Sequence, residues 1–114
     1  MKGYDIDGVI TAGIVPERNA VIVTGRSYEQ SAETYAMLRA RGIHNAVFFS
    51  PMFFHERNLS QSGKWKAFVI GLLGITEFYE DSEEQALEIL AETHCLVYRV
   101  MPDGTVNGIF GRKP

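Results

Sequence analysis

Two carboxylates near the start of the chain are the residues best placed for chemistry. A short run predicts a strand over residues 1–5 that ends at Asp5. Asp7 follows after one residue, directly before Gly8. Side chains alternate along a strand, but Asp-Gly favours a turn, so both carboxylates can converge on one site. Such a pair can bind a hard cation through oxygen, or divide nucleophilic and acid–base roles. Asp-Gly is also an ordinary turn dipeptide, so the pair alone does not define a site.

Two further polar positions follow predicted strands. Thr24 ends the apolar run 20–23, and Glu80 and Asp81 follow the run 75–79. The carboxyl ends of parallel strands face one crevice, so we expect these side chains to meet the first acidic pair there. Four carboxylates in one crevice require a cation, and Mg²⁺ prefers oxygen ligands. The pattern therefore predicts a magnesium site.

A phosphoryl group fits the chemistry of this crevice. A bound cation can hold one phosphoryl oxygen and leave Asp5 free to attack phosphorus in line. Thr24 and the backbone N–H groups of Gly25 and Arg26 suit another phosphoryl oxygen, because a helix is predicted to begin nearby. The charge that develops also needs a lysine. Lys64 and Lys66, at the start of a later helix, are expected to reach the same edge of the sheet.

The elements that must position these residues alternate between strands and helices. A first helix begins after Ser27 and a third after Ser82, each with glutamine three residues on, and a second helix ends at Gly74. We expect most of 50–63 to be loop. This alternation predicts a doubly wound, Rossmann-like α/β domain with a parallel sheet of about five strands, helices on both faces and a C-terminal hairpin. The predicted strands span 1–5, 20–24, 46–49, 75–79 and 95–101, with a final extended segment over 105–110.

Apolar spacing predicts which helix faces are buried. In the second helix the expected buried stripe is Trp65, Phe68, Val69, Leu72 and Leu73. In the first helix, Tyr28, Ala32, Tyr35, Ala36 and Leu38 recur at helical spacing.

Composition describes an ordinary globular protein. The 114 residues are 46% hydrophobic with a net charge of −3, which predicts one domain over 1–114 and argues against a DNA-coating protein. No apolar run is long enough to span a membrane, and no signal peptide is recognisable. The single cysteine, Cys95, is expected to be buried and inert in a reducing cytoplasm.

The motifs resemble those of the haloacid dehalogenase-like (HAD) phosphohydrolase superfamily over nearly the whole chain. Four motifs occur in the family's order, and the set is far more specific than the first motif alone. They are Asp5-Ile-Asp7-Gly-Val, Val-Ile-Val-Thr24-Gly-Arg26, the lysine of Gly63-Lys64-Trp65-Lys66, and Phe78-Tyr79-Glu80-Asp81-Ser82.

The resemblance assigns catalytic roles to individual residues. Asp5 is implied to be the nucleophile that forms an aspartyl-phosphate, and Asp7 the acid that protonates the leaving group and then the base that activates water. Thr24 is implied to hold the phosphoryl group. The run Trp65-Lys66-Ala-Phe-Val-Ile70 favours Lys66 as the catalytic lysine, with Lys64 as the alternative or as a substrate-binding residue beside Gly25 and Arg26.

The resemblance also implies a metal site. Asp5, Asp7 through its backbone carbonyl, and Asp81 are implied to hold Mg²⁺, with Glu80 in support. Family members often carry a cap domain, but residues 8–23 are too few to form one, and 25–63 are accounted for by other elements. A capless site is expected to be open.

An open site suits an accessible phosphate, such as a nucleic-acid end or a nucleotide. The stretch around Thr24-Gly-Arg26, with Glu33-Thr34, Leu38 and Gly42-Ile43, is similar to polynucleotide 3′-phosphatase domains. Those domains often have an arginine before the lysine, and Arg57 is the candidate counterpart. Phe53, Phe54 or Trp65 could stack on bases, although burial is the more ordinary role for Trp65. Met52 to Phe54 could be part of the core, or they could instead rim the site or make a subunit contact.

Three other functions fit part of the pattern. The first motif is also similar to that of sugar-acid phosphatases whose subunits close one another's sites, so the oligomeric state stays open. A non-catalytic Mg²⁺- or phosphate-binding module, such as a receiver-like switch, would also place acids, a threonine and a lysine at strand ends. A metal-dependent nuclease would need the acidic motifs in the opposite order.

Overall fold

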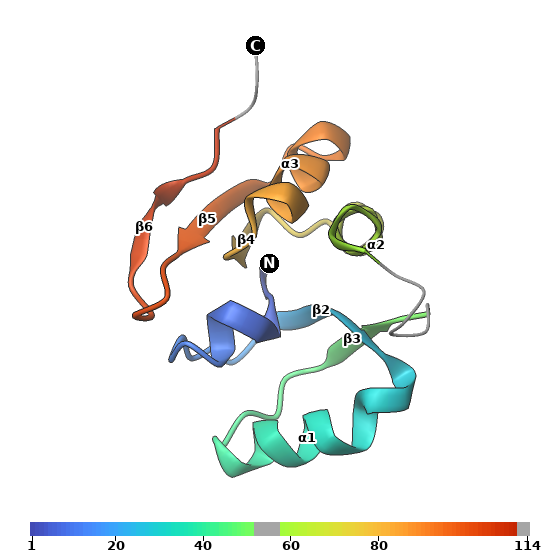
Figure 1. Cartoon of the computed structure of the whole chain (residues 1–114), viewed down its shortest axis with the longest axis vertical. Helices are drawn as coiled ribbons and strands as arrows, with labels where there is room; N and C mark the ends of the chain where they lie inside the picture. Colours follow the sequence, from blue (N-terminus) through green and yellow to red (C-terminus); the bar gives the residue numbers. More distant parts are fainter. Residues whose placement is uncertain (52–57, 112–114) are drawn as a thin grey trace.

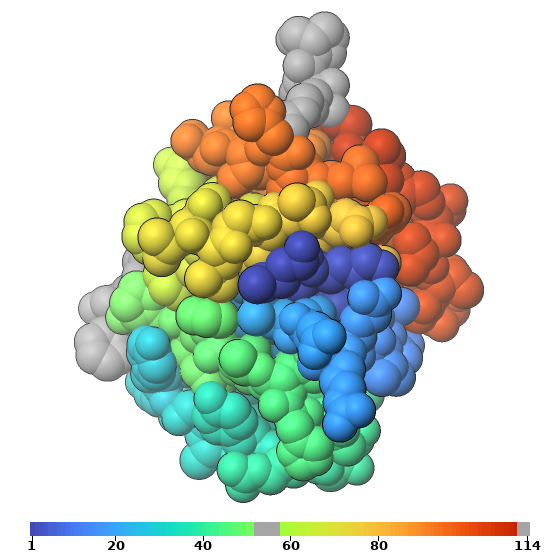
Figure 2. Space-filling model, turned by 180° about the vertical axis from the view of Figure 1, so that it is seen from behind, coloured from blue at the N-terminus to red at the C-terminus, as the bar shows by residue number. Residues whose placement is uncertain are grey.

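Six strands form one sheet within residues 1–51 and 58–111, the part of the chain that the computed structural model describes (Figure 1). The strand order is β3-β2-β1-β4-β5-β6, and all neighbours pair parallel except β5 and β6, which are antiparallel. Seen from behind, the dark blue N-terminal residues lie between a yellow segment that leads into β4 and a light blue segment that leads into β2 (Figure 2). The strands are β1 (Lys2–Tyr4), β2 (Val21–Ser27), β3 (Val47–Ser50), β4 (Glu77–Glu80), β5 (Leu96–Val100) and β6 (Val106–Ile109).

Helices alternate with the parallel strands, as predicted, so the expected α/β class is confirmed. Gln30 accepts the Ser27 N–H at 3.1 Å and Ser82 accepts the Gln85 N–H at 3.3 Å, while Gly74 ends the second helix at a φ of 68°. No helix within the described residues is long and apolar enough to cross a membrane. The helices are η1 (Ile6–Ile10), η2 (Tyr28–Gln30), α1 (Ser31–Ala40), α2 (Leu59–Leu73) and α3 (Glu83–Glu92).

The sheet has a hydrophobic core on each face. Val23 and its cluster pack against α2 and α3, whereas neighbouring Ile22 points to the other face and packs with η1 and Leu38 of α1. Figure 1 shows α1 on one side of the strands and α2 and α3 on the other. β1 lies between β2 and β4, and the segment that follows it packs on the face of the sheet that α1 covers. Cys95 is buried in the first core, as predicted.

The start of α2 was predicted too late. The structure begins this helix at Leu59, so residues 59–63 are helical and not loop. Asn58 caps the helix by accepting the Gln61 N–H at 2.8 Å, and the Gln61 side chain accepts the Asn58 N–H at 3.0 Å. This reciprocal pair satisfies two N–H groups that would otherwise lack partners at the helix start. The extra turn brings Ser62 close to β2.

The buried stripe predicted for α2 is wrong at two positions. Phe68 and Leu72 are 61% and 71% exposed, whereas Lys66 is 1% exposed. The helix is rotated about its axis relative to the predicted orientation, because the Lys66 ammonium lies inside the protein beside two carboxylates. In this orientation Phe68 and Leu72 face solvent. In α1 the same error occurs. Leu38 is buried, in line with the predicted spacing, and so is Thr34, which was not in the predicted set. The other residues of the set are exposed: Tyr28, Ala32, Tyr35 and Ala36.

Two glycines of α2 allow a matched test of the contact between α2 and α3. A Cβ on Gly63 would lie 2.8 Å from Glu88 Cβ and 2.9 Å from Gln85 Cα, whereas a Cβ on Gly71 would meet no described atom within 4 Å. We expect Gly63→Ala to destabilise the fold by about 1–3 kcal/mol through overpacking. Gly71→Ala should stabilise it by up to about 1 kcal/mol through helix propensity. Urea unfolding of both variants measures the difference, and equal effects would contradict the close packing.

Candidate functional site

The predicted convergence of strand ends is present in the structure. Asp5 directly follows β1 and Asp81 directly follows β4, the strand that pairs with β1 in parallel. The Asp5 N–H donates to the Tyr79 carbonyl at 3.1 Å, which places Asp5 beside Glu80. On the other side β1 pairs with β2, which carries Thr24. The acidic residues and Thr24 therefore share one edge of the sheet.

A tight turn after β1 separates the first two carboxylates. Asp7 has an extended backbone and Gly8 has a φ of 82°, so the chain bends at the predicted Asp-Gly dipeptide. Thr11 Oγ1 accepts the Gly8 N–H at 2.9 Å and holds the bend. A Cβ on Gly8 would overlap the Asp81 carboxylate, so only glycine lets this turn pass so close to β4.

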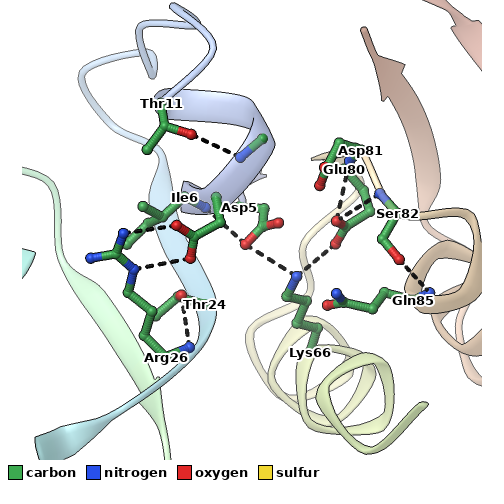
Figure 3. Close-up of polar contacts among 12 residues, drawn as sticks. Asp5, Ile6, Thr11, Thr24, Arg26, Lys66, Glu80, Asp81, Ser82 and Gln85 are labelled. Atoms are coloured by element: carbon green, nitrogen blue, oxygen red, sulfur yellow. Dashed lines mark hydrogen bonds and ion pairs between the residues drawn. The ribbon is translucent and has the colours of Figure 1, made fainter. Parts of the chain in front are cut away.

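Lys66 lies at the centre of the acidic residues. Its Nζ is 2.7 Å from Glu80 Oε2 and 3.1 Å from Asp5 Oδ1 (Figure 3). Burial acts to lower the pKa of Lys66, but the negative charges of Asp5 and Glu80 outweigh it and raise this pKa above its ordinary value. Lys66 is therefore a fixed, buried ammonium that holds Asp5 in place.

The two oxygens of Glu80 both have partners within the protein. Oε2 accepts from Lys66, and Oε1 accepts the N–H groups of Asp81 and Ser82 at 3.1 and 3.2 Å. Burial, with the nearby charge of Asp5, raises the pKa of Glu80 well above its ordinary value, and Lys66 offsets this only in part. Glu80 therefore fixes the Lys66 side chain and the backbone of the loop that begins at Asp81.

Three carboxylates lie close enough to hold a metal ion. One oxygen from each of Asp5, Glu80 and Asp81 lies within 4.8 Å of the others. Burial and the charge of Asp5 raise the pKa of Asp81, as expected where negative charges gather. Asp5 and Asp81 line the adjoining cavity, whereas Glu80 is fully buried, so the first two are the better placed ligands. An all-oxygen donor set fits a hard cation.

Asp7 points to a different partner. Arg26 Nε and Nη2 donate to the two Asp7 carboxylate oxygens at 2.9 and 2.7 Å, and Nη1 donates to Thr34 Oγ1 at 3.0 Å. The hydrogen bonds to Asp7 raise the pKa of Arg26 further. The Asp7 side chain is therefore not among the three clustered carboxylates, and its predicted contribution to a metal site would have to come from its backbone carbonyl.

A cavity of about 420 Å³ opens beside these groups. Thr24, predicted to hold the phosphoryl group, is fully buried and does not line the cavity, and its Oγ1 accepts the Arg26 N–H at 3.0 Å. Gly25 and Arg26 are the residues of β2 that line the cavity. Lys64 is exposed on α2 and lines a separate hollow with Phe68. The described residues around the cavity are Asp5, Asp7, Gly8, Gly25, Arg26, Leu59, Ser62, Lys66, Asp81, Ser82 and Gln85.

Sequence reasoning missed several cavity residues. Leu59 and Ser62 were assigned to a loop, and the Asn58 and Gln61 capping pattern is the signal that could have placed them on a helix. Gln85 was noted only as a helix-start residue, yet it lines the cavity, and its Oε1 is buried without a hydrogen-bond partner in the described part of the chain. The candidates Arg57, Met52, Phe53 and Phe54 lie outside the described residues.

The site combines three groups around one cavity: carboxylates that could hold a cation, the buried Lys66 ammonium, and the Asp7 carboxylate bound by Arg26. A negatively charged oxygen-rich group such as a phosphoryl group could be bound in this cavity by a cation and by the backbone N–H of Gly25. No protein-family model, curated protein or solved structure matches the chain.

Proposed function

We propose that this chain is a Mg²⁺-dependent phosphomonoester hydrolase of the HAD-like kind, with a doubly wound Rossmann-like sheet and no cap domain. One observation carries the proposal: the buried Lys66 Nζ bridges Asp5 and Glu80, at 3.1 and 2.7 Å, while Asp81 faces the same cavity. A carboxylate fixed by an ammonium, beside further carboxylates for a cation, suits a nucleophile that attacks phosphorus. The motif order in the sequence supports the same conclusion.

The reaction has two steps that share one nucleophile. In the first, an Asp5 carboxylate oxygen bonds to phosphorus, the ester P–O bond breaks, and the leaving oxygen takes a proton from Asp7. In the second, a water oxygen bonds to phosphorus while Asp7 takes a proton from that water, and the bond between phosphorus and Asp5 breaks. Orthophosphate is released, Asp5 is again a carboxylate, and Asp7 again carries the proton that it must hold before the first step.

The remaining residues hold the phosphoryl group and the cation. Asp5, Asp81 and the Asp7 carbonyl would bind Mg²⁺, with Glu80 orienting the loop after β4 through the N–H groups of Asp81 and Ser82. Mg²⁺ would supply positive charge to the phosphoryl oxygens. Lys66 keeps Asp5 oriented, and Gly25, which lines the cavity, would supply its backbone N–H to another phosphoryl oxygen.

The proposed substrate is an accessible phosphate such as a nucleic-acid end or a nucleotide. Two observations support this class: residues 8–23 are too few for a folded cap, and the cavity lies at the edge of the sheet beside the first turns of α2 and α3. A small sugar phosphate becomes the better candidate if a second subunit closes the cavity.

Phosphate release from a panel of esters tests the proposal. The panel contains 3′- and 5′-phosphorylated oligonucleotides, mononucleotides, sugar phosphates and phosphopeptides, with and without Mg²⁺. We expect Mg²⁺-dependent release, selective for one oligonucleotide end or for nucleotides. Release from sugar phosphates alone would support the oligomeric alternative. A folded protein that hydrolyses no ester would support a binding module instead.

Metal binding provides a separate prediction. Removing the Asp81 carboxylate in Asp81→Asn should weaken Mg²⁺ binding by at least about tenfold, because one of the charged ligands is lost. Glu83→Gln is the matched control, since Glu83 is an exposed carboxylate two residues away. Isothermal titration calorimetry with Mg²⁺ measures both affinities. Equal weakening in the two variants would show that only general negative charge matters.

A further inference from the structure

Arg26 makes three side-chain hydrogen bonds, two of them to Asp7. We propose that Arg26 is a positioning residue, which holds the Asp7 carboxylate at the edge of the cavity for proton transfer to and from the reacting oxygens. This inference rests on the proposed function and deepens it, because it assigns a separate basic side chain to each acidic residue: Lys66 to Asp5 and Arg26 to Asp7.

The anchor of Arg26 lies in the protein interior. Its Nη1 donates to Thr34 Oγ1 at 3.0 Å, and this fully buried hydroxyl donates in turn to the Gln30 carbonyl at 2.7 Å. The Arg26 N–H is also fixed, because it donates to Thr24 Oγ1. Arg26 is therefore fixed both at its backbone N–H and at Nη1 of its guanidinium group. The other two guanidinium nitrogens, Nε and Nη2, donate to Asp7.

Asp7 needs such a partner because its side chain is exposed. The relative exposure of the side chain is 62% for Asp7 and 18% for Arg26. An exposed aspartate changes rotamer freely, whereas a group that transfers a proton must stay within about 3 Å of the reacting oxygen. Two parallel N–H···O bonds fix both the position and the plane of a carboxylate, which the single point charge of a lysine does not do.

The two basic side chains, Arg26 and Lys66, also keep the Asp5 and Asp7 carboxylates apart. In Figure 3 the side chains of Arg26 and Lys66 lie on either side of Asp5. Lys66 binds Asp5 at 3.1 Å, and Arg26 binds Asp7 at 2.7 Å, although the two acids are only two residues apart in the chain. The chain thus directs one carboxylate toward attack on phosphorus and holds the other away from the cluster of three.

The choice of ester distinguishes positioning of Asp7 from binding of substrate. A nitrophenyl phosphate releases a stable phenolate that needs no proton, whereas an alkyl phosphate requires an acid. In single-turnover measurements of leaving-group release, which report the first step alone, we expect Arg26→Gln to slow release by about 10- to 100-fold for the alkyl ester and much less for the nitrophenyl ester, as Asp7→Asn should. Arg26→Lys should restore little, and the Arg26→Gln, Asp7→Asn double variant should be no slower than Asp7→Asn.

Two controls separate this role from folding and from catalysis itself. Thr34→Val removes the anchor without touching the cavity, and should show the same preference between esters in weaker form. The NMR resonance of Arg26 Nε–Hε reports the ion pair without any substrate, and it should move in Asp7→Asn.

Each remaining outcome has a definite meaning. An equal loss on both esters that appears in KM would show that Arg26 binds substrate, and an additive double variant would show that it acts independently of Asp7. An unchanged Nε–Hε resonance in Asp7→Asn would overturn the ion pair, even if the wild-type protein hydrolyses esters. A wild-type protein without Mg²⁺-dependent turnover would overturn the proposed function and, with it, the role of Arg26 in proton transfer.

Discussion

Replacing Lys66 with glutamine is expected to abolish phosphate release and to lower the free energy of unfolding by about 3–5 kcal/mol. The variant leaves Asp5 and Glu80 buried beside each other without the ammonium that lies 3.1 and 2.7 Å from them. Removing one partner from a buried ion pair costs more than the pair itself contributes, because the remaining charge stays desolvated. Urea unfolding at neutral pH, with phosphate release measured in parallel, gives both effects.

Lys64→Gln is the matched control on the same helix. Lys64 is exposed on α2 and lines a different hollow, so its replacement should change the free energy of unfolding by less than about 0.5 kcal/mol. Phosphate release should stay close to that of the wild-type protein. If Lys64→Gln abolished release and Lys66→Gln did not, the lysine of the reaction would be Lys64, and Lys66 would be structural alone.

Asp5→Asn is expected to reduce turnover by at least about 10⁴-fold, because an amide cannot form the aspartyl-phosphate. The fold should survive. The amide oxygen can still accept the Ile6 N–H, which lies 2.8 Å from Asp5 Oδ1, and Lys66 keeps Glu80 as its counterion. We therefore expect a smaller loss of stability than in Lys66→Gln. Phosphate release over long incubations, with circular dichroism as the check on folding, measures the effect.

Turnover by Asp5→Asn would have a clear consequence. If the folded variant released phosphate at the wild-type rate, water would have to attack the ester directly, and Asp5 would be a metal ligand only. The comparison with Asp81→Asn then becomes informative. Loss of metal binding alone should be relieved by a higher Mg²⁺ concentration, whereas loss of the nucleophile should not.

The sequence predicted that the acidic residues that follow strands lie close together, and the structure has this arrangement. The run 20–24 is short and apolar up to Thr24, as in a buried strand, and the run 75–79 is a short segment between two helical patterns. Parallel strands bring their carboxyl ends to one edge. Asp5, Glu80 and Asp81 therefore meet as expected. Their closeness follows from strand order, since β1 lies directly beside β4.

Other features depend on tertiary contacts that no local pattern records. Phe68 and Leu72 fit an apolar stripe, but burial of Lys66 against two carboxylates rotates α2 and leaves them exposed. The pairing of Asp7 with Arg26 joins residues 19 positions apart, and depends on how β2 continues past Thr24. Apolar spacing cannot predict either result. In α2 the charged side chain of Lys66 lies in the interior, and after β1 a turn directs the Asp7 side chain outward to Arg26.

The aspartyl-phosphate itself is the most direct test of the account. Asp7→Asn with a nitrophenyl phosphate should let the first step proceed, since this leaving group needs no acid, and should slow the attack of water. After acid quench, mass spectrometry should then find one phosphoryl group on the peptide that contains Asp5, removable by hydroxylamine and absent from the Asp5→Asn, Asp7→Asn double variant. A phosphoryl group on another residue, or phosphate release in this variant with no phosphorylated chain at any time, would contradict the proposed mechanism.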